Sequence, residues 1–125
     1  MELLKKLTEQ VAPSGNEKPV RDLIIEEIKN YCDEIEVDVL GNIIAKKHGN
    51  GKKIMLSAHM DEVGFIATVI NDKNIIRFSK IGGVKINTLQ SRRIVFDSGI
   101  KGIINLDNGK TLDNSTKIDD FYVTP

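Results

Sequence analysis

Apolar residues recur with a helical period in two stretches at the start of the chain. The first predicted helix covers residues 2–11 and ends before Pro13, because the residue before a proline is biased away from helical backbone. Its apolar stripe consists of Leu3, Leu4, Leu7 and Val11. The second helix extends to about Tyr31, with an apolar face formed by Val20, Leu23, Ile24 and Ile28. We expect the second helix to bury its apolar face.

The start of the second helix can be interpreted in two ways. Ser14 and Glu17 have the spacing of a capping box, in which a serine and a glutamate side chain bond free amides of the first turn. Pro19 is acceptable only within the first turn of a helix, where its missing N–H has no partner in any case. Asn16 is therefore an equally good N-cap.

Beyond the helices the period of the apolar residues changes to two. Residues 35–39 alternate as a half-exposed strand, Gly41-Asn42 is a turn signal, and residues 43–45 form a second strand. The glycines and asparagine of residues 48–51 predict a tight connection, because these residues tolerate positive φ. The run Ile54–Ala58 is nearly all apolar, which predicts a strand buried on both faces.

From residue 65 onward, short strand-like stretches alternate with turn signals, and no helical stripe remains. These stretches are residues 65–70, 75–78, 94–96, 102–106 and 121–123. Their regular spacing is typical of a small barrel or sandwich. We therefore expect an α/β protein, α+β over the residues present, with a boundary near residue 64 that separates domains 1–64 and 65–125.

The composition excludes several classes of function. The chain has 125 residues, 40% of them hydrophobic, which is enough for a core. Its 18 Lys and Arg balance 18 Asp and Glu, which argues against nucleic acid as the main partner because phosphate binding needs a basic excess. A single cysteine excludes an internal disulfide and a cysteine-based zinc site. With no membrane-length apolar run and no signal-peptide pattern, we expect a cytoplasmic protein without a membrane partner.

The segment Ser57–Glu62 contains the strongest candidate chemistry. His59 and Asp61 are two residues apart at the end of the predicted buried strand, so their side chains can point to the same side. A metal-bound imidazole needs an acceptor for the proton on its second nitrogen, and a carboxylate at this spacing supplies one. On spacing alone, the alternative is a surface turn that carries His, Asp and Glu by chance.

Other reactive side chains are expected to be structural. Ser57, His59 and Asp61 include the residue types of a catalytic triad, but neighbours in one strand cannot reach its relay geometry. Cys32, at a helix end, is expected to be a half-buried packing residue. His48 is expected to be solvated in its loop.

Several segments occur in an order and spacing that resemble one known family. They are Val11–Glu17, Asp38–Ala45, Ser57–Phe65, Ile81–Val84 and Lys101–Ile104. The chain resembles the N-terminal portion of the metallo-aminopeptidases known as glutamyl or deblocking aminopeptidases, also labelled cellulase M or endoglucanase. The resemblance extends over essentially all 125 residues, and the stretch A-H-M-D-E-V-G-F is its most specific part.

The resemblance implies a two-metal peptidase, with zinc or cobalt, whose α/β catalytic domain is interrupted by an inserted β-barrel lid. Residues 1–64 match the first part of the catalytic domain, and residues 65–125 match most of the lid. His59 matches the first metal ligand, and Asp61 matches the catalytic aspartate that orients it. In such enzymes the paired metals activate a water that attacks the peptide carbonyl next to a free N-terminus, and a glutamate acts as general base. No other cofactor-binding residue is implied.

The family's remaining ligands and its general base lie beyond the lid, which is still incomplete where this chain reaches Pro125. Glu62 is therefore not expected to be the base, and at most weak metal binding is expected. Three functions stay open: part of an aminopeptidase that acts on peptides, a catalytically incomplete module for oligomerisation or interaction, and a regulatory partner of a separate chain. A homo-oligomer is expected. A glycosidase has little support, because the chain has no tryptophan and only 5% aromatic residues.

Overall fold

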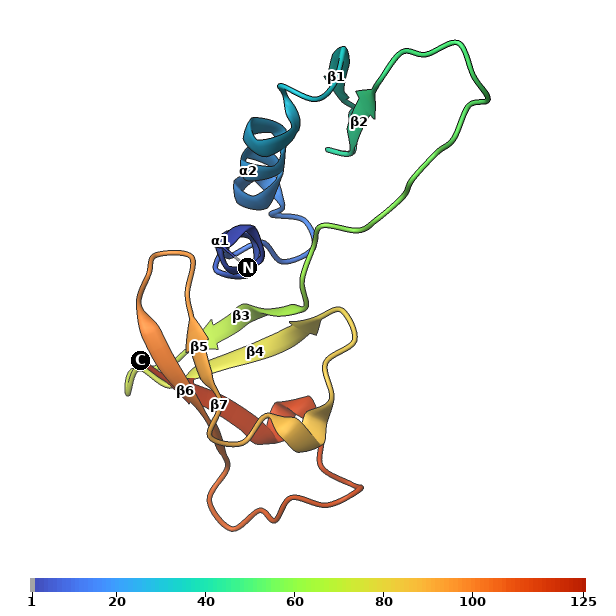
Figure 1. Cartoon of the computed structure of the whole chain (residues 1–125). Helices are drawn as coiled ribbons and strands as arrows, with labels where there is room; N and C mark the ends of the chain where they lie inside the picture. Colours follow the sequence, from blue (N-terminus) through green and yellow to red (C-terminus); the bar gives the residue numbers. More distant parts are fainter. Residues whose placement is uncertain (1) are drawn as a thin grey trace. The chain divides into compact units, whose positions relative to one another are not determined.

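The computed structural model describes residues 2–125, which form two compact units. The first unit ends at Glu62, and the second runs from Val63 to Pro125 (Figure 1). Helices and a two-stranded ribbon make up the first unit, and the second is a β-sheet with two short 3₁₀ turns. The mixed α/β character predicted from the sequence is thus present. Over residues 2–125, every helix is too short or too polar to cross a bilayer.

Two helices begin the first unit, α1 (Glu2–Thr8) and α2 (Lys18–Ile28). Val20 on α2 is buried, whereas Leu3 and Leu4 on the apolar stripe of α1 are exposed. α2 begins after Glu17 with no side-chain cap, and both predicted caps, Ser14 and Asn16, are therefore wrong. The Glu17 carboxylate instead accepts the Gly15 N–H at 2.6 Å, and the Ser14 hydroxyl bonds elsewhere.

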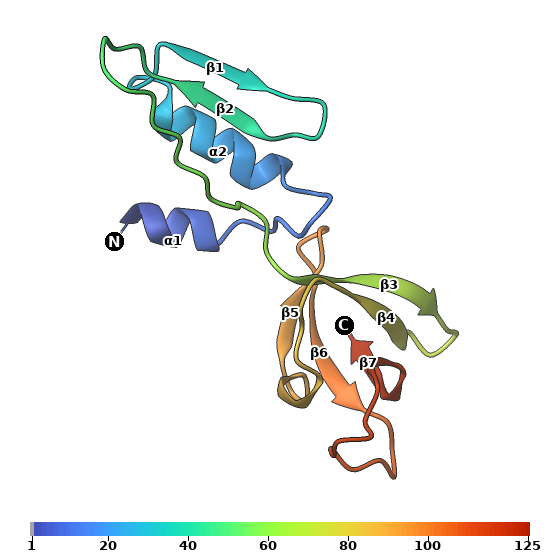
Figure 2. The same cartoon turned by 90° about the vertical axis from the view of Figure 1, so that its right-hand side faces the viewer.

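The strands β1 (Glu34–Val37) and β2 (Ile43–Lys46) form an antiparallel ribbon. α2 runs alongside this ribbon (Figure 2). The Asp38 carboxylate closes the turn between the strands, because it accepts the backbone N–H groups of Leu40 and Asn42, each at 2.9 Å. Gly41 has φ +89°, a backbone conformation that favours glycine. The strand β1 therefore ends earlier than predicted, and Val39 lies in the turn.

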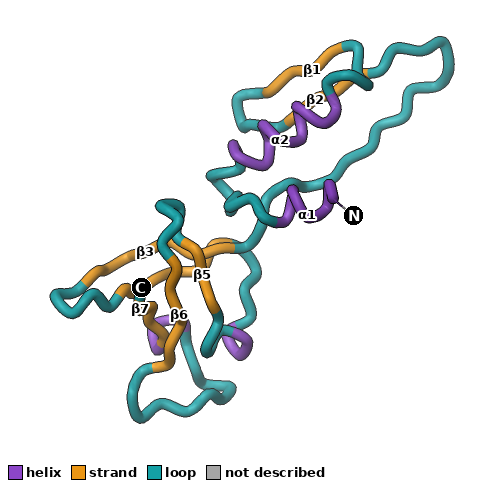
Figure 3. The backbone as a smooth tube through the Cα atoms, turned by 60° about the vertical axis from the view of Figure 1, so that its left-hand side comes forward, coloured by secondary structure: helices purple, strands orange, loops and turns teal. Residues whose placement is uncertain are grey.

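A long loop without strands follows β2 (Figure 3). The predicted tight connection at residues 48–51 and the predicted buried strand Ile54–Ala58 are both absent from it. Ile54, Met55 and Leu56 are instead 85%, 88% and 92% exposed. A strand needs a neighbour for its backbone N–H and C=O groups, and the first unit places none beside this run. The run Ile54–Ala58 thus has the apolar composition of a buried strand but no neighbouring strand to pair with among the described residues.

The second unit is one antiparallel sheet with the strand order β3-β4-β7-β6-β5. Its strands are β3 (Gly64–Ile70), β4 (Ile76–Ile81), β5 (Arg93–Val95), β6 (Lys101–Leu106) and β7 (Phe121–Thr124). Short 3₁₀ helices cover Ile86–Thr88 and Ile118–Asp120. The sheet is curled, and β3 and β5 form its two edges (Figure 1). All five predicted strand positions are confirmed within a few residues.

One hydrophobic cluster holds the sheet together. It consists of Ile76, Phe78, Leu89, Ile104, Phe121 and Val123. Buried and less buried positions alternate along β4, β6 and β7, as expected for strands with one face on a core. Gly102 lies where a Cβ atom would come within 2.7 Å of Cγ1 of Val123, so glycine allows β6 and β7 to pack closely.

Candidate functional site

The candidate site lies in the first unit, where the long loop returns to the segment between the two helices. The Glu62 N–H donates to the Ala12 carbonyl at 3.0 Å, and the Ser14 N–H donates to the Glu62 carbonyl at 3.3 Å. These bonds flank a parallel bridge between Pro13 and Glu62. Ala12 is buried, so the bridge is anchored at one end in the packed part of the unit. The residues just before it, His59 and Asp61, are thereby fixed against residues 12–14.

The imidazole of His59 is oriented by Asp61. Its Nδ1 lies 3.0 Å from Oδ1 of Asp61 and 3.1 Å from the Asp61 carbonyl oxygen. Both neighbours are acceptors, so Nδ1 must carry the proton. In the neutral ring Nε2 then keeps a free lone pair. The His59 side chain is 85% exposed, which leaves that lone pair accessible to a ligand.

The carboxylate of Asp61 is shared between two donors. Its Oδ2 accepts the Ser14 hydroxyl at 2.5 Å, while Oδ1 faces His59. Hydrogen bonds from the Ser14 hydroxyl and then from His59 hold the pKa of Asp61 below its ordinary value. Asp61 is therefore ionised near neutral pH, as an acceptor for the His59 proton must be.

The side chain of Glu62 has a structural contact. Its Oε1 accepts the Ala12 N–H at 3.1 Å, which adds a third bond to the bridge between the two segments. A carboxylate engaged in this way holds the loop in place.

The donor set fits one position in the coordination sphere of a metal ion. A neutral imidazole with a free Nε2 and its Nδ1–H on a carboxylate is the arrangement that metal-binding histidines adopt. Among residues 2–125, no three His, Cys, Asp or Glu side chains lie close enough to hold a metal ion together. The described residues therefore bring together one imidazole with a free Nε2 and the carboxylate that orients it.

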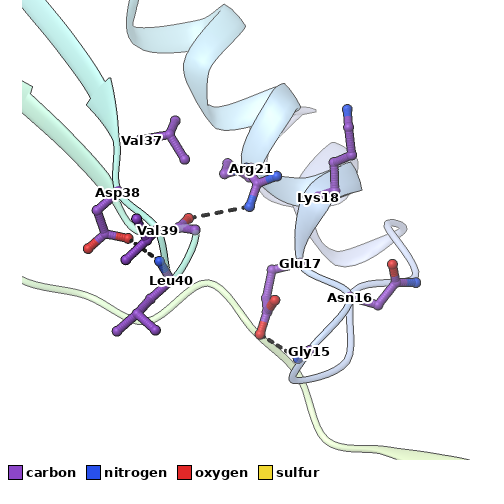
Figure 4. Close-up of a pocket in the computed structure, with 10 residues that line it drawn as sticks. Gly15, Asn16, Glu17, Lys18, Arg21, Val37, Asp38, Val39 and Leu40 are labelled. Atoms are coloured by element: carbon purple, nitrogen blue, oxygen red, sulfur yellow. Dashed lines mark hydrogen bonds between the residues drawn. The ribbon is translucent and has the colours of Figure 1, made fainter.

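A shallow pocket of about 340 Å³ lies elsewhere in the first unit, between the start of α2 and the β1–β2 turn (Figure 4). Its charged groups already bond to their own chain: Lys18 pairs with Asp22, and the Arg21 guanidinium makes a long 3.5 Å contact to the Gly41 carbonyl. The Asp38 carboxylate is occupied by the turn, and hydrogen bonds from Asn42 lower its pKa. The residues that line this pocket include neither His59 nor Asp61.

The remaining sequence candidates lie apart from this site. His48 is exposed, as predicted, and its Nε2 lies 3.0 Å from Oε1 of Glu34. Cys32 is a free, half-buried cysteine, as predicted.

Sequence reasoning offered Ser14, with Asn16 as an equally good alternative, as a helix cap and missed its place at this site. Ser14 and Asp61 are 47 positions apart, and local spacing carries no signal across that separation. The only hint was that both residues lie in segments that carry the family resemblance.

Comparison with known proteins identifies the family. The sequence model of the M42 glutamyl aminopeptidases matches residues 41–120. This chain belongs to that family of peptidases. The match begins at the β1–β2 turn and extends through most of the second unit, so it includes both His59 and Asp61.

One relative is a protein of Acetivibrio thermocellus that is named as a provisional aminopeptidase. It is 52% identical to this chain over 103 residues. The alignment covers 82% of this chain and 31% of that relative. An aminopeptidase structure from the archaeon Desulfurococcus kamchatkensis superposes with a TM-score of 0.86 at 36% identity. That match covers 98% of this chain and 36% of the other. The chain thus spans about a third of the length of these relatives.

Two further structures carry different names. A Thermotoga maritima protein named endoglucanase is 33% identical with a TM-score of 0.79, over 96% of this chain and 37% of that one. The TET1 peptidase of Pyrococcus horikoshii is 34% identical with a TM-score of 0.79, over 98% of this chain and 39% of its own. TET1 can assemble into a tetrahedron or a large octahedral shell.

Proposed function

We propose that this chain is the N-terminal portion of a two-metal aminopeptidase that removes the N-terminal residue of peptides in the cytoplasm. In this proposal residues 1–64 form the first part of the catalytic domain, and residues 65–125 form most of the lid. The observation that carries the proposal is the orientation of His59, whose Nδ1 lies 3.0 Å from an ionised Asp61 and whose Nε2 is exposed. Membership of the M42 family supports it.

Each residue of the site has a distinct role in this proposal. His59 would bind one divalent ion, zinc or cobalt, through Nε2, and Asp61 would keep the proton on Nδ1. When bound, the metal pair supplies Lewis-acid polarisation of the peptide carbonyl and a lowered pKa for water. The other ligands and the general base would come from residues outside this chain. Glu62 contributes by tying the loop to Ala12.

A metal titration followed by NMR tests this assignment. Addition of Co²⁺ to the full chain is expected to broaden the ring signals of His59 first, because its Nε2 is exposed and its tautomer is already set. Binding is expected to be weak, since one imidazole leaves most coordination positions to water. The chain has two histidines, so His48→Ala is the matched control for His59→Ala.

The variant His59→Ala is expected to abolish the broadening near residue 59, and His48→Ala is expected to leave it unchanged. If broadening is centred on His48, or persists around Asp61 in His59→Ala, His59 is not the ligand.

A second candidate function is an oligomerisation module, which the exposed run Ile54–Leu56 favours. These apolar side chains lie on a loop with unpaired backbone groups, and such a segment can pair with a second copy of itself. The assemblies formed by TET1 make self-association a reasonable property of this family member as well.

We expect the chain to form dimers or larger assemblies in light scattering at high concentration. The substitution Leu56→Asp is expected to shift the mass toward the monomer, because it places a charge within the apolar run. Val39→Asp is the matched control, since Val39 is an equally exposed apolar residue outside the run. A clean monomer for the unmodified chain, or an equal effect of both substitutions, would contradict this role for the run.

A further inference from the structure

We propose that Ser14 is a positioning residue for His59. Its hydroxyl fixes the carboxylate of Asp61, and the fixed carboxylate in turn holds the proton on Nδ1 of the imidazole. This inference rests on the proposed function, because the orientation matters only if Nε2 of His59 binds a metal ion. The relay itself, however, can be observed in the chain without any metal.

The two oxygens of the Asp61 carboxylate face two different partners. Oδ2 lies 2.5 Å from the Ser14 hydroxyl, and Oδ1 lies 3.0 Å from Nδ1 of His59. A carboxylate can rotate about the bond to its Cβ atom, so one hydrogen bond leaves its orientation loose. The bond from Ser14 restrains that rotation and keeps Oδ1 directed at the ring.

Ser14 can perform this task because its own backbone is held. Its N–H donates to the Glu62 carbonyl at 3.3 Å, and the preceding residue forms the bridge to Glu62. The Asn16 N–H closes the following turn on the Pro13 carbonyl at 2.8 Å. A serine side chain has one rotatable bond between its backbone and its oxygen. The position of the Ser14 hydroxyl is therefore restrained, because its backbone lies next to the bridge between Pro13 and Glu62.

Besides the Asp61 carboxylate, the described contact that constrains the imidazole is the Asp61 carbonyl oxygen, 3.1 Å from Nδ1. The His59 side chain is mostly exposed, so packing does not select its rotamer. The tautomer of a neutral imidazole depends on which ring nitrogen has a hydrogen-bond acceptor beside it. If the Asp61 carboxylate were free to rotate, the Nδ1–H would keep only the Asp61 carbonyl oxygen as a protein acceptor, and the ring would populate more of the tautomer in which Nε2 carries the proton. That tautomer cannot bind a metal ion through Nε2.

The experiment measures the tautomer of His59 directly in the full chain without metal. Long-range proton–nitrogen NMR spectra, recorded at a pH where the ring is neutral, distinguish the two tautomers of each histidine. We expect His59 to be mainly in the Nδ1–H form. Ser14→Val is expected to lower the ratio of Nδ1–H to Nε2–H about two- to tenfold, the effect of losing one modest hydrogen bond. Ser14→Thr has nearly the same shape as the valine variant but keeps the hydroxyl, and is expected to preserve the ratio.

His48 serves as the internal reference, because its ring contacts Glu34 and not this relay. The amide signals of Ala12 and Glu62 report whether the bridge is intact in each variant. Equal ratios in the threonine and valine variants, with the bridge intact in both, would overturn the inference. If the valine variant disrupts the bridge, Ser14→Ala provides the same comparison with less steric change. A tautomer that responds as expected, in a chain whose His59 binds no Co²⁺, would support the relay and overturn the proposed metal function.

Discussion

The purified chain, supplied with Zn²⁺ or Co²⁺, is expected to hydrolyse aminoacyl chromogenic substrates no faster than the same metal ion in buffer. Enzymes owe rate enhancements of about a millionfold or more to a complete constellation of catalytic groups. A catalytic zinc site takes three protein ligands, and a two-metal site needs further ligands that hold both ions. Residues 2–125 bring together one histidine with its orienting carboxylate.

Two histidine variants serve as controls for this expectation. The unmodified chain, His59→Ala and His48→Ala should all give the same background rate as the metal ion alone. Turnover that disappears in His59→Ala and remains in His48→Ala would mean that these residues supply the missing groups themselves. In that case the assignment of the other ligands and the base to residues outside the chain would be wrong.

The substitution Phe121→Ala is expected to cost about 3–5 kcal/mol in the free energy of unfolding, the usual range for removing a fully buried phenylalanine. Phe121 is 0% exposed and lies in the single cluster that joins β4, β6 and β7. A unit of this size has a total stability on the order of 3–9 kcal/mol. The variant should therefore lose most of the structure of the second unit.

Urea titration followed through the amide signals of β4, β6 and β7 measures this effect. Ile70→Ala is the matched control, because Ile70 is 66% exposed on the edge strand β3 and its truncation should cost less than about 0.5 kcal/mol. Equal midpoints for the two variants would show that the cluster around Phe121 does not stabilise the sheet.

The strands of the second unit could be predicted because their neighbours lie within the same unit. Phe121 and Val123 alternate with more exposed residues on β7, and Ile76 and Phe78 do the same on β4. The alternation of apolar and polar residues in the sequence therefore matches the alternation of buried and exposed side chains in the folded unit. The run Ile54–Ala58 fails for the opposite reason, since its apolar pattern indicates burial but no element of the first unit covers it.

The part of the candidate site that neighbouring residues form could be predicted from the sequence. The spacing of His59 and Asp61 predicts that the carboxylate faces the ring, and the contact between Oδ1 and Nδ1 confirms it. Ser14 was one of two candidate caps, beside Asn16, because Ser and Glu three positions apart have the capping-box pattern. The partner of the Ser14 hydroxyl is Asp61, 47 positions away. Only the folded chain shows that Ser14 bonds to Asp61 and does not cap the helix.

The bridge between Pro13 and Glu62 also determines which parts of the chain can change length. It closes a loop of nearly fifty residues, and the free-energy cost of closing a flexible loop grows only with the logarithm of its length, about 0.6 kcal/mol per doubling. A few residues added at the exposed positions Asn50 and Gly51 would therefore alter the closure entropy very little. Such an insertion leaves residues 12–14 and 59–62 intact, so this loop can carry a probe or accept new sequence while the geometry around His59 is kept.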